Sequence, residues 1–168
     1  IPGFVIAGNG AKRLLIRAAG PALDEFGVPG VLADPQLAVF KGGTLVLSND
    51  NWSADLSKAG VVTSFGRLVG AFPFAAGSKD AALFTSLEPG AYTIQVSGVG
   101  NTTGTAMIEV YDLDEADANK SRLVNLATRA LVQARFGPVI SGFVVQGAVA
   151  KAVLIRATGP ALAGFGLT

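Results

Sequence analysis

Four oxygen-bearing side chains lie within seven residues, at Asn49, Asp50, Asn51 and Asp55. Carboxylate and amide oxygens are the ligands that a hard cation such as calcium takes, although this spacing does not follow the EF-hand loop. The same residue types also form Asx turns, in which the side chain bonds to nearby backbone groups. The sequence leaves both interpretations open, a calcium site and a turn, and no other cofactor is expected.

Two further features can carry chemistry. Trp52, the one tryptophan, follows the Asn-rich turn, where an aromatic ring can stack on a sugar or can instead fill a core or an interface. Asp112, Asp114, Glu115 and Asp117 form a second acidic group, which is either a metal site or a solvated loop. These residues predict at most a binding site for polysaccharide or calcium.

The composition argues against an enzyme. The chain has 168 residues without His, which removes the commonest general base and the Ser-His pairing, and without Cys, which removes disulfides and thiolate metal sites. A net charge of +1 without a basic block does not fit nucleic acid as a partner. The longest uncharged apolar run, Phe136 to Ala150, has 15 residues and contains Gly and Pro, so no membrane insertion is expected.

The strongest feature is an internal repeat. The segments Gly3–Gly27 and Gly142–Gly166 are identical at 16 of 25 positions without a gap, and Gly142 lies 139 residues after Gly3. A period of this size indicates a domain-scale repeat rather than a solenoid unit. We therefore expect residues 1–139 to form one repeat unit and residues 140–168 to begin a second copy.

The second copy must pair with something, and three arrangements remain open. It can complete the sheet of its own domain, open the next unit of an array, or add strands to a neighbouring chain. In the third case the chain builds a filament. The residues expected to make these contacts are Gly142, Phe143, Val144, Val145, Leu154, Ile155 and Arg156.

Two cations recur in both copies. Arg17 corresponds to Arg156, and Lys12 corresponds to Lys151. A charged side chain inside an apolar strand needs a carboxylate or several carbonyls around it. We favour a repeated structural ion pair over an anion-binding site.

Short β-branched and aliphatic runs separated by Gly-rich turns dominate the chain. One hairpin is expected from Phe4–Ile6 with Arg13–Arg17, and a second from Leu37–Phe40 with Thr44–Leu47. The best helix candidate is Ser53–Val69, with Ser53 as its cap.

Further strands follow the helix candidate, and Asp112 to Ser121 is expected to be a linker or exposed loop. A meander is predicted from Ala81–Thr85, Tyr92–Ser97 and Ala106–Tyr111, and later strand candidates are Leu123–Val132, Val139–Val145 and Ala152–Ala157. This pattern predicts an all-β fold, an antiparallel β-sandwich or barrel-like domain with one or two short helices.

Several motifs resemble a known repeat. In order they read GFVIAG, KRLLIRAAGPAL, LADPQLAVF, SNDNW, AFPFAAGSKDAAL, PGAYTIQVSG with EVYD, and RLVNLATRA. They are similar to a tandem β-rich repeat of large secreted and surface proteins of Verrucomicrobia-type bacteria, and the central part resembles β-sandwich modules appended to secreted peptidases. The resemblance implies an exported, non-catalytic module located outside the cell or on the bacterial surface.

Two functions follow as expectations. The first is an extracellular structural repeat that self-associates head to tail into a fibre, filament or surface array, with copies of itself as partners. The alternative is a monomeric accessory or adhesion module that binds polysaccharide through Trp52, with calcium at the neighbouring turn.

Overall fold

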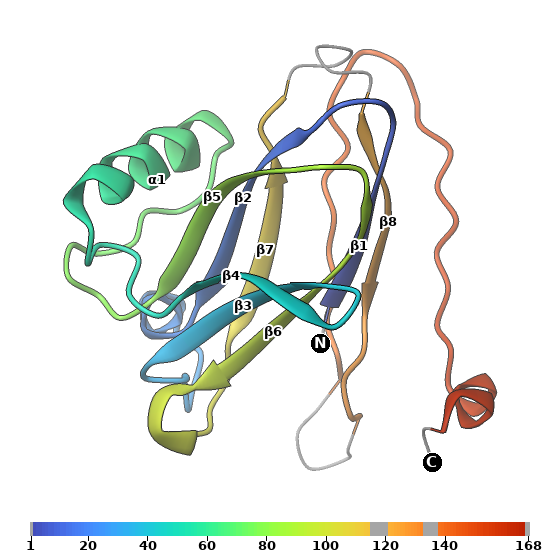
Figure 1. Ribbon diagram of the computed structural model, residues 1–168. Coiled ribbons are helices and arrows are strands. Elements are labelled where there is room, and N and C mark those ends of the chain that lie inside the picture. The colour runs from blue at the N-terminus through green and yellow to red at the C-terminus, as the bar shows by residue number, and fades with distance from the viewer. Residues whose placement is uncertain (1, 115–120, 133–137, 167–168) are drawn as a thin grey trace. The chain divides into compact units, whose positions relative to one another are not determined.

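The computed structural model describes residues 2–114, 121–132 and 138–166, which belong to two units, Ile1–Val132 and Gln133–Thr168. The first unit consists of two antiparallel β-sheets, which confirms the expected sandwich fold with short helices (Figure 1). Its strands are β1 (Pro2–Ala7), β2 (Lys12–Ala19), β3 (Pro35–Lys41), β4 (Thr44–Asn49), β5 (Ala81–Leu87), β6 (Gly90–Gly98), β7 (Met107–Asp112) and β8 (Arg122–Thr128).

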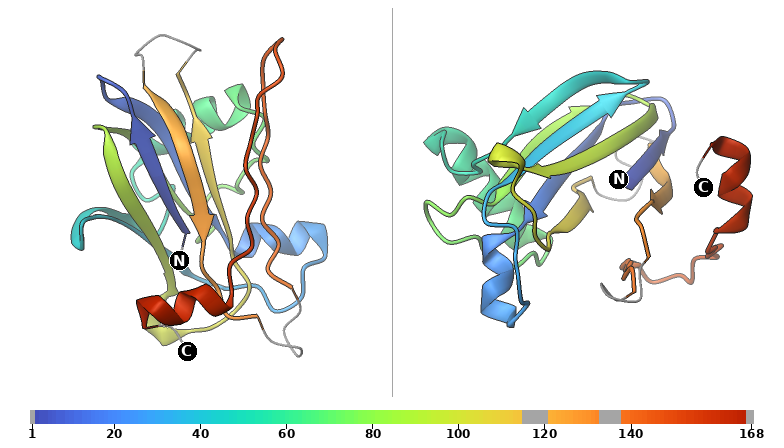
Figure 2. Two further views of the ribbon diagram at one scale, coloured as in Figure 1. Left: turned by 90° about the vertical axis from the view of Figure 1, so that its right-hand side faces the viewer. Right: turned by 90° about the horizontal axis from the view of Figure 1, so that it is seen from below.

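The strand order divides the first copy of the repeat between the two sheets. The five-stranded sheet has the order β4-β3-β6-β1-β8, and the three-stranded sheet has the order β5-β2-β7. Thus β1 lies between β6 and β8, and β2 is the central strand of the smaller sheet; Figure 2 shows β1 beside β8 from a second side.

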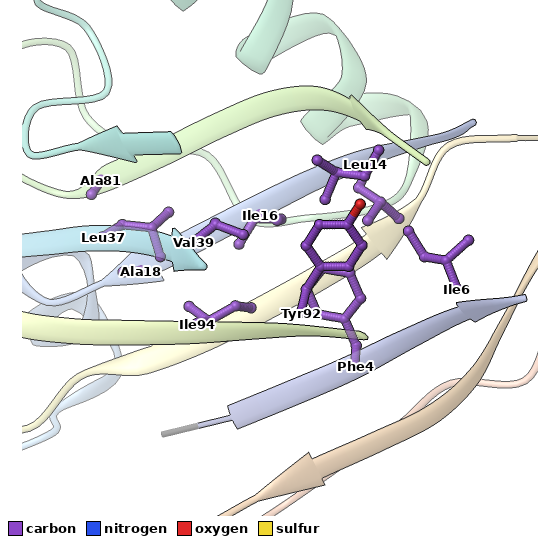
Figure 3. Close-up of a cluster of buried hydrophobic side chains, with 11 residues drawn as sticks. Phe4, Ile6, Leu14, Ile16, Ala18, Leu37, Val39, Ala81, Tyr92 and Ile94 are labelled. Carbon is purple, nitrogen blue, oxygen red and sulfur yellow. The ribbon is translucent and has the colours of Figure 1, made fainter. Parts of the chain in front are cut away.

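Alternate residues of β2 face opposite sides of its sheet, as the period of a strand requires. Leu14, Ile16 and Ala18 point into the space between the sheets, where they pack with Phe4 and the stacked ring of Tyr92 (Figure 3). Burial of these apolar side chains is the main stabilising contribution of the first copy.

The other face of the smaller sheet is covered by α1 (Leu56–Leu68) (Figure 1). Leu15 of β2 packs there with Ala59 and Val62 of the helix. The helix begins after Asp55, whose side chain accepts from the backbone N–H groups of Ser57 and Lys58, and not at the expected Ser53. Asp is as good an N-cap as Ser, and the first residue able to cap is not always the one that does.

Of the expected strand pairings, one hairpin is confirmed and two pairings are wrong. β3 and β4 pair directly around Gly42-Gly43. β1 and β2 do not form a hairpin, because each pairs with strands of a different sheet, and β5, β6 and β7 alternate between sheets instead of forming a meander. A Gly-rich turn reverses the chain but does not choose the neighbour, and in a sandwich the reversal can cross from one sheet to the other.

Two short 3-10 helices complete the first unit, η1 (Pro21–Phe26) and η2 (Val99–Asn101). The second unit has one such helix, η3 (Pro160–Phe165), and residues 138–159 of it form no strand. The expected strands Val139–Val145 and Ala152–Ala157 are therefore wrong for this chain, since an extended segment becomes a strand only when a neighbour satisfies its backbone. No helix among the described residues is long and apolar enough to cross a membrane.

Candidate assembly site

The two copies of the repeated segment differ most in how much of their apolar surface is covered. In the first copy Phe4 is 1% exposed, and Leu15 and Ile16 are fully buried. Their counterparts Phe143, Leu154 and Ile155 are 56%, 85% and 74% exposed. The second copy thus carries a core sequence without a core around it.

Parts of the local conformation are nevertheless the same in both copies. Gly20 before η1 and Gly159 before η3 have φ, ψ of −123°, −79° and −122°, −83°. Gly27 and Gly166 end the two helices with φ of 70° and 74°, the left-handed conformation that favours glycine. The same local sequence therefore accompanies the same helix conformation in both copies.

The side chain of Arg17, on the α1 side of β2, is surrounded by two aromatic rings, a backbone carbonyl and a carboxylate. Its guanidinium carbon lies 3.8 Å from the centroid of Phe74 and 4.5 Å from that of Phe72, and its Nη1 donates to the Phe72 carbonyl at 2.8 Å. Its Nε lies 3.2 Å from Oε2 of Glu109 on the paired strand β7, although the two atoms are not aligned as a hydrogen bond. Burial lowers the pKa of Arg17, and Glu109 acts in the opposite direction.

Lys12 and Arg13 share acidic partners at the start of β2. Lys12 Nζ lies 2.8 Å from Asp112 Oδ1 and 3.4 Å from Asp114 Oδ2, and Arg13 Nε donates to Asp114 Oδ1 at 2.7 Å. Burial alone would raise the pKa of Asp114, but the hydrogen bonds from Arg13 and the charge of Lys12 outweigh it and lower this pKa. The Asp114 carboxylate therefore favours the folded arrangement in its ionised form.

Backbone N–H groups of the first copy also bind a side chain that lies outside the repeated segment. The buried carboxylate of Asp80 accepts from Gly20 N at 2.8 Å and from Ala22 N at 3.2 Å. At Gly20 a Cβ atom would overlap the carbonyl oxygen of Leu32 and lie 3.1 Å from Cδ of Pro35. Glycine is thus required at this position by the packing of the sandwich.

All four carboxylates that hold the first copy lie outside it, and sequence reasoning identified only part of this arrangement. The partner of Arg17 is Glu109, about ninety positions away in the sequence, which no local spacing indicates. The expected structural ion pair exists in the first copy. Residues 138–168 contain Lys151 and Arg156 but no Asp or Glu, so the second copy keeps both cations without a carboxylate of its own.

Two of the residues expected to hold calcium, Asn49 and Asp55, make other hydrogen bonds. Asn49 accepts from Ala82 N at 2.9 Å and donates to the Asn51 carbonyl at 3.3 Å, and Asp55 caps α1. The hydrogen bonds from Ser57 and Lys58 lower the pKa of Asp55 to about 2. Asp50 is exposed. In the described part of the chain, no three His, Cys, Asp or Glu side chains are placed to hold a metal ion.

The remaining candidate residues are Trp52 and the second acidic group. Trp52 is buried, packs edge-on against Phe74 and donates from Nε1 to Ser78 Oγ at 3.1 Å, which leaves no open ring face for a sugar. In the second acidic group, Asp112 and Asp114 bind Lys12, whereas Glu115 and Asp117 lie outside the described residues.

The residues expected to mediate assembly, Gly142, Phe143, Val144, Val145, Leu154, Ile155 and Arg156, are all exposed in the second unit. Comparison with known proteins adds no relative, since no family model, curated protein or solved structure matches the chain. The candidate site is therefore defined by the repeat itself and by the residues that surround its first copy.

Proposed function

We propose that the chain is a non-catalytic structural repeat module of the bacterial cell exterior, which associates head to tail with copies of itself into a fibre, filament or surface array. One observation carries the proposal. The second copy exposes the apolar side chains that build the core in the first copy, including Phe143, Leu154 and Ile155. Exposed apolar surface of this extent is typical of an interaction site. The location outside the cell rests on the family resemblance of the motifs.

The chemistry of the second copy favours a partner like the first unit. Lys151 and Arg156 match the two cations that the first unit neutralises with carboxylates of β7 and of the chain just after it. A lipid surface or a polysaccharide would not require both cations to keep their spacing. Polysaccharide binding stays a prediction, and the burial of Trp52 does not favour it.

The test compares the full chain with a chain that ends at Ile140. Light scattering measures the mass of each over a range of concentrations, and electron microscopy of the same samples detects filaments. We expect the full chain to reach high mass and the shortened chain, which keeps every strand of the sandwich, to be a monomer. A monomeric full chain, or a shortened chain that still assembles, would contradict the proposal.

A further inference from the structure

The contacts of the first copy point to a specific partner site, and this inference rests on the proposed function. We infer that the second copy, Gly142–Gly166, is a donor segment that takes the place of β1, β2 and η1 in the sandwich of another molecule of this chain. It would do so in the same register as the first copy. The acceptor is the groove between β6 and β8 in one sheet and between β5 and β7 in the other.

Glycines that only the docked state requires support this assignment. Gly20 is needed because a Cβ atom there would overlap the Leu32 carbonyl oxygen, and at Gly3 a Cβ atom would lie 3.2 Å from the Tyr92 carbonyl oxygen, which is closer than an ordinary contact. The counterparts Gly142 and Gly159 have nothing within 4 Å of such a Cβ atom in the free segment. Glycine at these two positions therefore fits a segment that packs against the same carbonyls elsewhere.

The charges of the second copy match those of the first unit, which indicates that the acceptor is another molecule of this chain. Docked in register, Arg156 lies where Arg17 contacts Glu109, Phe72 and Phe74, and Lys151 lies where Lys12 binds Asp112 and Asp114. All of these partners lie outside the first copy, so they remain in an acceptor whose own first copy has left. Because both cations must meet a carboxylate when they are buried, the two ion pairs fix the register of the docked segment as well as attract it.

The differences between the copies predict when exchange occurs. At two core positions the first copy has the larger side chain, with Ile6 and Leu14 against Val145 and Val153, and it alone has Arg13 to bind Asp114. Each methylene lost from a core side chain lowers stability, because it leaves unfilled space between the sheets. The first copy is therefore preferred in its own sandwich, and the second copy enters a place that is vacant or transiently open, as in domain swapping.

The decisive experiment traps the register with a disulfide, since the chain has no cysteine of its own. Val5 of β1 lies opposite Ala91 of β6, and both point away from the core. Its counterpart in the second copy is Val144, so the trap is Val144→Cys with Ala91→Cys. Directly opposite residues of antiparallel strands have Cα atoms about 4.5–5.5 Å apart, which a disulfide spans. The control Gln146→Cys with Ala91→Cys faces the same side but is two residues out of register.

The full chain is refolded from denaturant at high concentration, oxidised, and analysed on a non-reducing gel. We expect a ladder of linked chains for the Val144 pair and at least tenfold less of it for the Gln146 pair. Adding Gly159→Ala, which would overlap Leu32 in the acceptor, should abolish the ladder, whereas Gly164→Ala should not, because its counterpart Glu25 has an exposed side chain. Adding Gly20→Ala should strengthen the ladder, because it weakens the packing of the chain's own first copy. If that variant does not fold, the comparison is made in chains that keep Gly20.

Three outcomes would overturn the inference: equal cross-linking of the two pairs, a ladder insensitive to Gly159→Ala, or a disulfide confined to single chains. Light scattering of the same samples separates this failure from failure of the proposed function. Assemblies that need the second copy but show no Val144–Ala91 link would leave the proposed function standing with a different contact. Chains that remain monomers without a link would contradict both.

Discussion

At the scale of single residues, the first unit depends on two cations buried beside carboxylates. Arg17 and Lys12 lie almost fully buried on β2, and each faces an acidic partner from β7 or from the residues just after it. Removing one member of such a pair costs more than the pair contributes, because the other charge stays buried without compensation. The same two residue types in the second copy have no such role in the isolated segment.

Replacing Arg17 by Met should lower the free energy of unfolding by about 3–5 kcal/mol, because the buried Oε2 atom of Glu109 then lies without its cation. The matched control is Arg156→Met, which changes the same residue type at the same position of the exposed second copy. Urea unfolding of both variants should show a change of less than about 0.5 kcal/mol for the control, as for ordinary surface substitutions. Equal losses in the two variants would mean that the Arg17 environment is not what stabilises the unit.

Asp114 should make the stability of the first unit depend on pH. Its pKa is lowered in the folded state, so the contribution is present above the usual Asp pKa of about 3.9 and is lost as the pH falls through the lower folded value. Urea unfolding from pH 7 down to pH 3 should show this acidic loss, and Asp114→Asn should reduce it while lowering stability at pH 7. An Asp114→Asn variant with the same acidic loss as the original chain would contradict this prediction.

At the scale of elements, residues close in sequence were predictable and partners distant in sequence were not. The β3–β4 hairpin follows from local turn chemistry. The sheet order does not, because Gly8-Asn9-Gly10 connects β1 and β2 across two sheets. The candidate site shows the same limit, since the repeat was readable in the sequence but Glu109 and Asp80 were not recognisable as its partners.

Asp80, which lies just before β5, binds the backbone N–H groups at the start of η1 through its carboxylate. Asp80→Ala would leave the buried N–H groups of Gly20 and Ala22 without an acceptor, and each unsatisfied group costs about 1–3 kcal/mol. Asp80→Asn keeps an acceptor oxygen at similar volume and should lose clearly less. Thermal unfolding and amide exchange at these two positions check the prediction, and a similar loss in both variants would assign the effect to charge rather than to these hydrogen bonds.

At the scale of the whole molecule, one sequence pattern exists in two states. In the first unit the pattern supplies an inner strand to one sheet and the central strand to the other, whereas in the second unit residues 138–159 form no strand. The two copies nevertheless form the same 3-10 helix between the same glycines. A module of this kind is stable only where the surrounding strands are present.

A chain whose first copy is rewritten with the sequence of the second copy tests this equivalence. Nine substitutions convert Gly3–Gly27: Ile6→Val, Ala7→Gln, Asn9→Ala, Gly10→Val, Arg13→Ala, Leu14→Val, Ala19→Thr, Asp24→Ala and Glu25→Gly. We expect the sandwich to form with a lower melting temperature, because the smaller core side chains each cost about 1 kcal/mol and Ala19→Thr adds a hydroxyl and a methyl group at a fully buried site. Reverting Ala19→Thr and Arg13→Ala should recover most of the loss. As a control, the same second-copy sequence inserted one residue out of register should not fold, since a one-residue slip turns every core side chain outward. If the in-register chain is equally unfolded by circular dichroism, the second copy is not competent to build this sandwich, and its exposed apolar residues must serve a different contact.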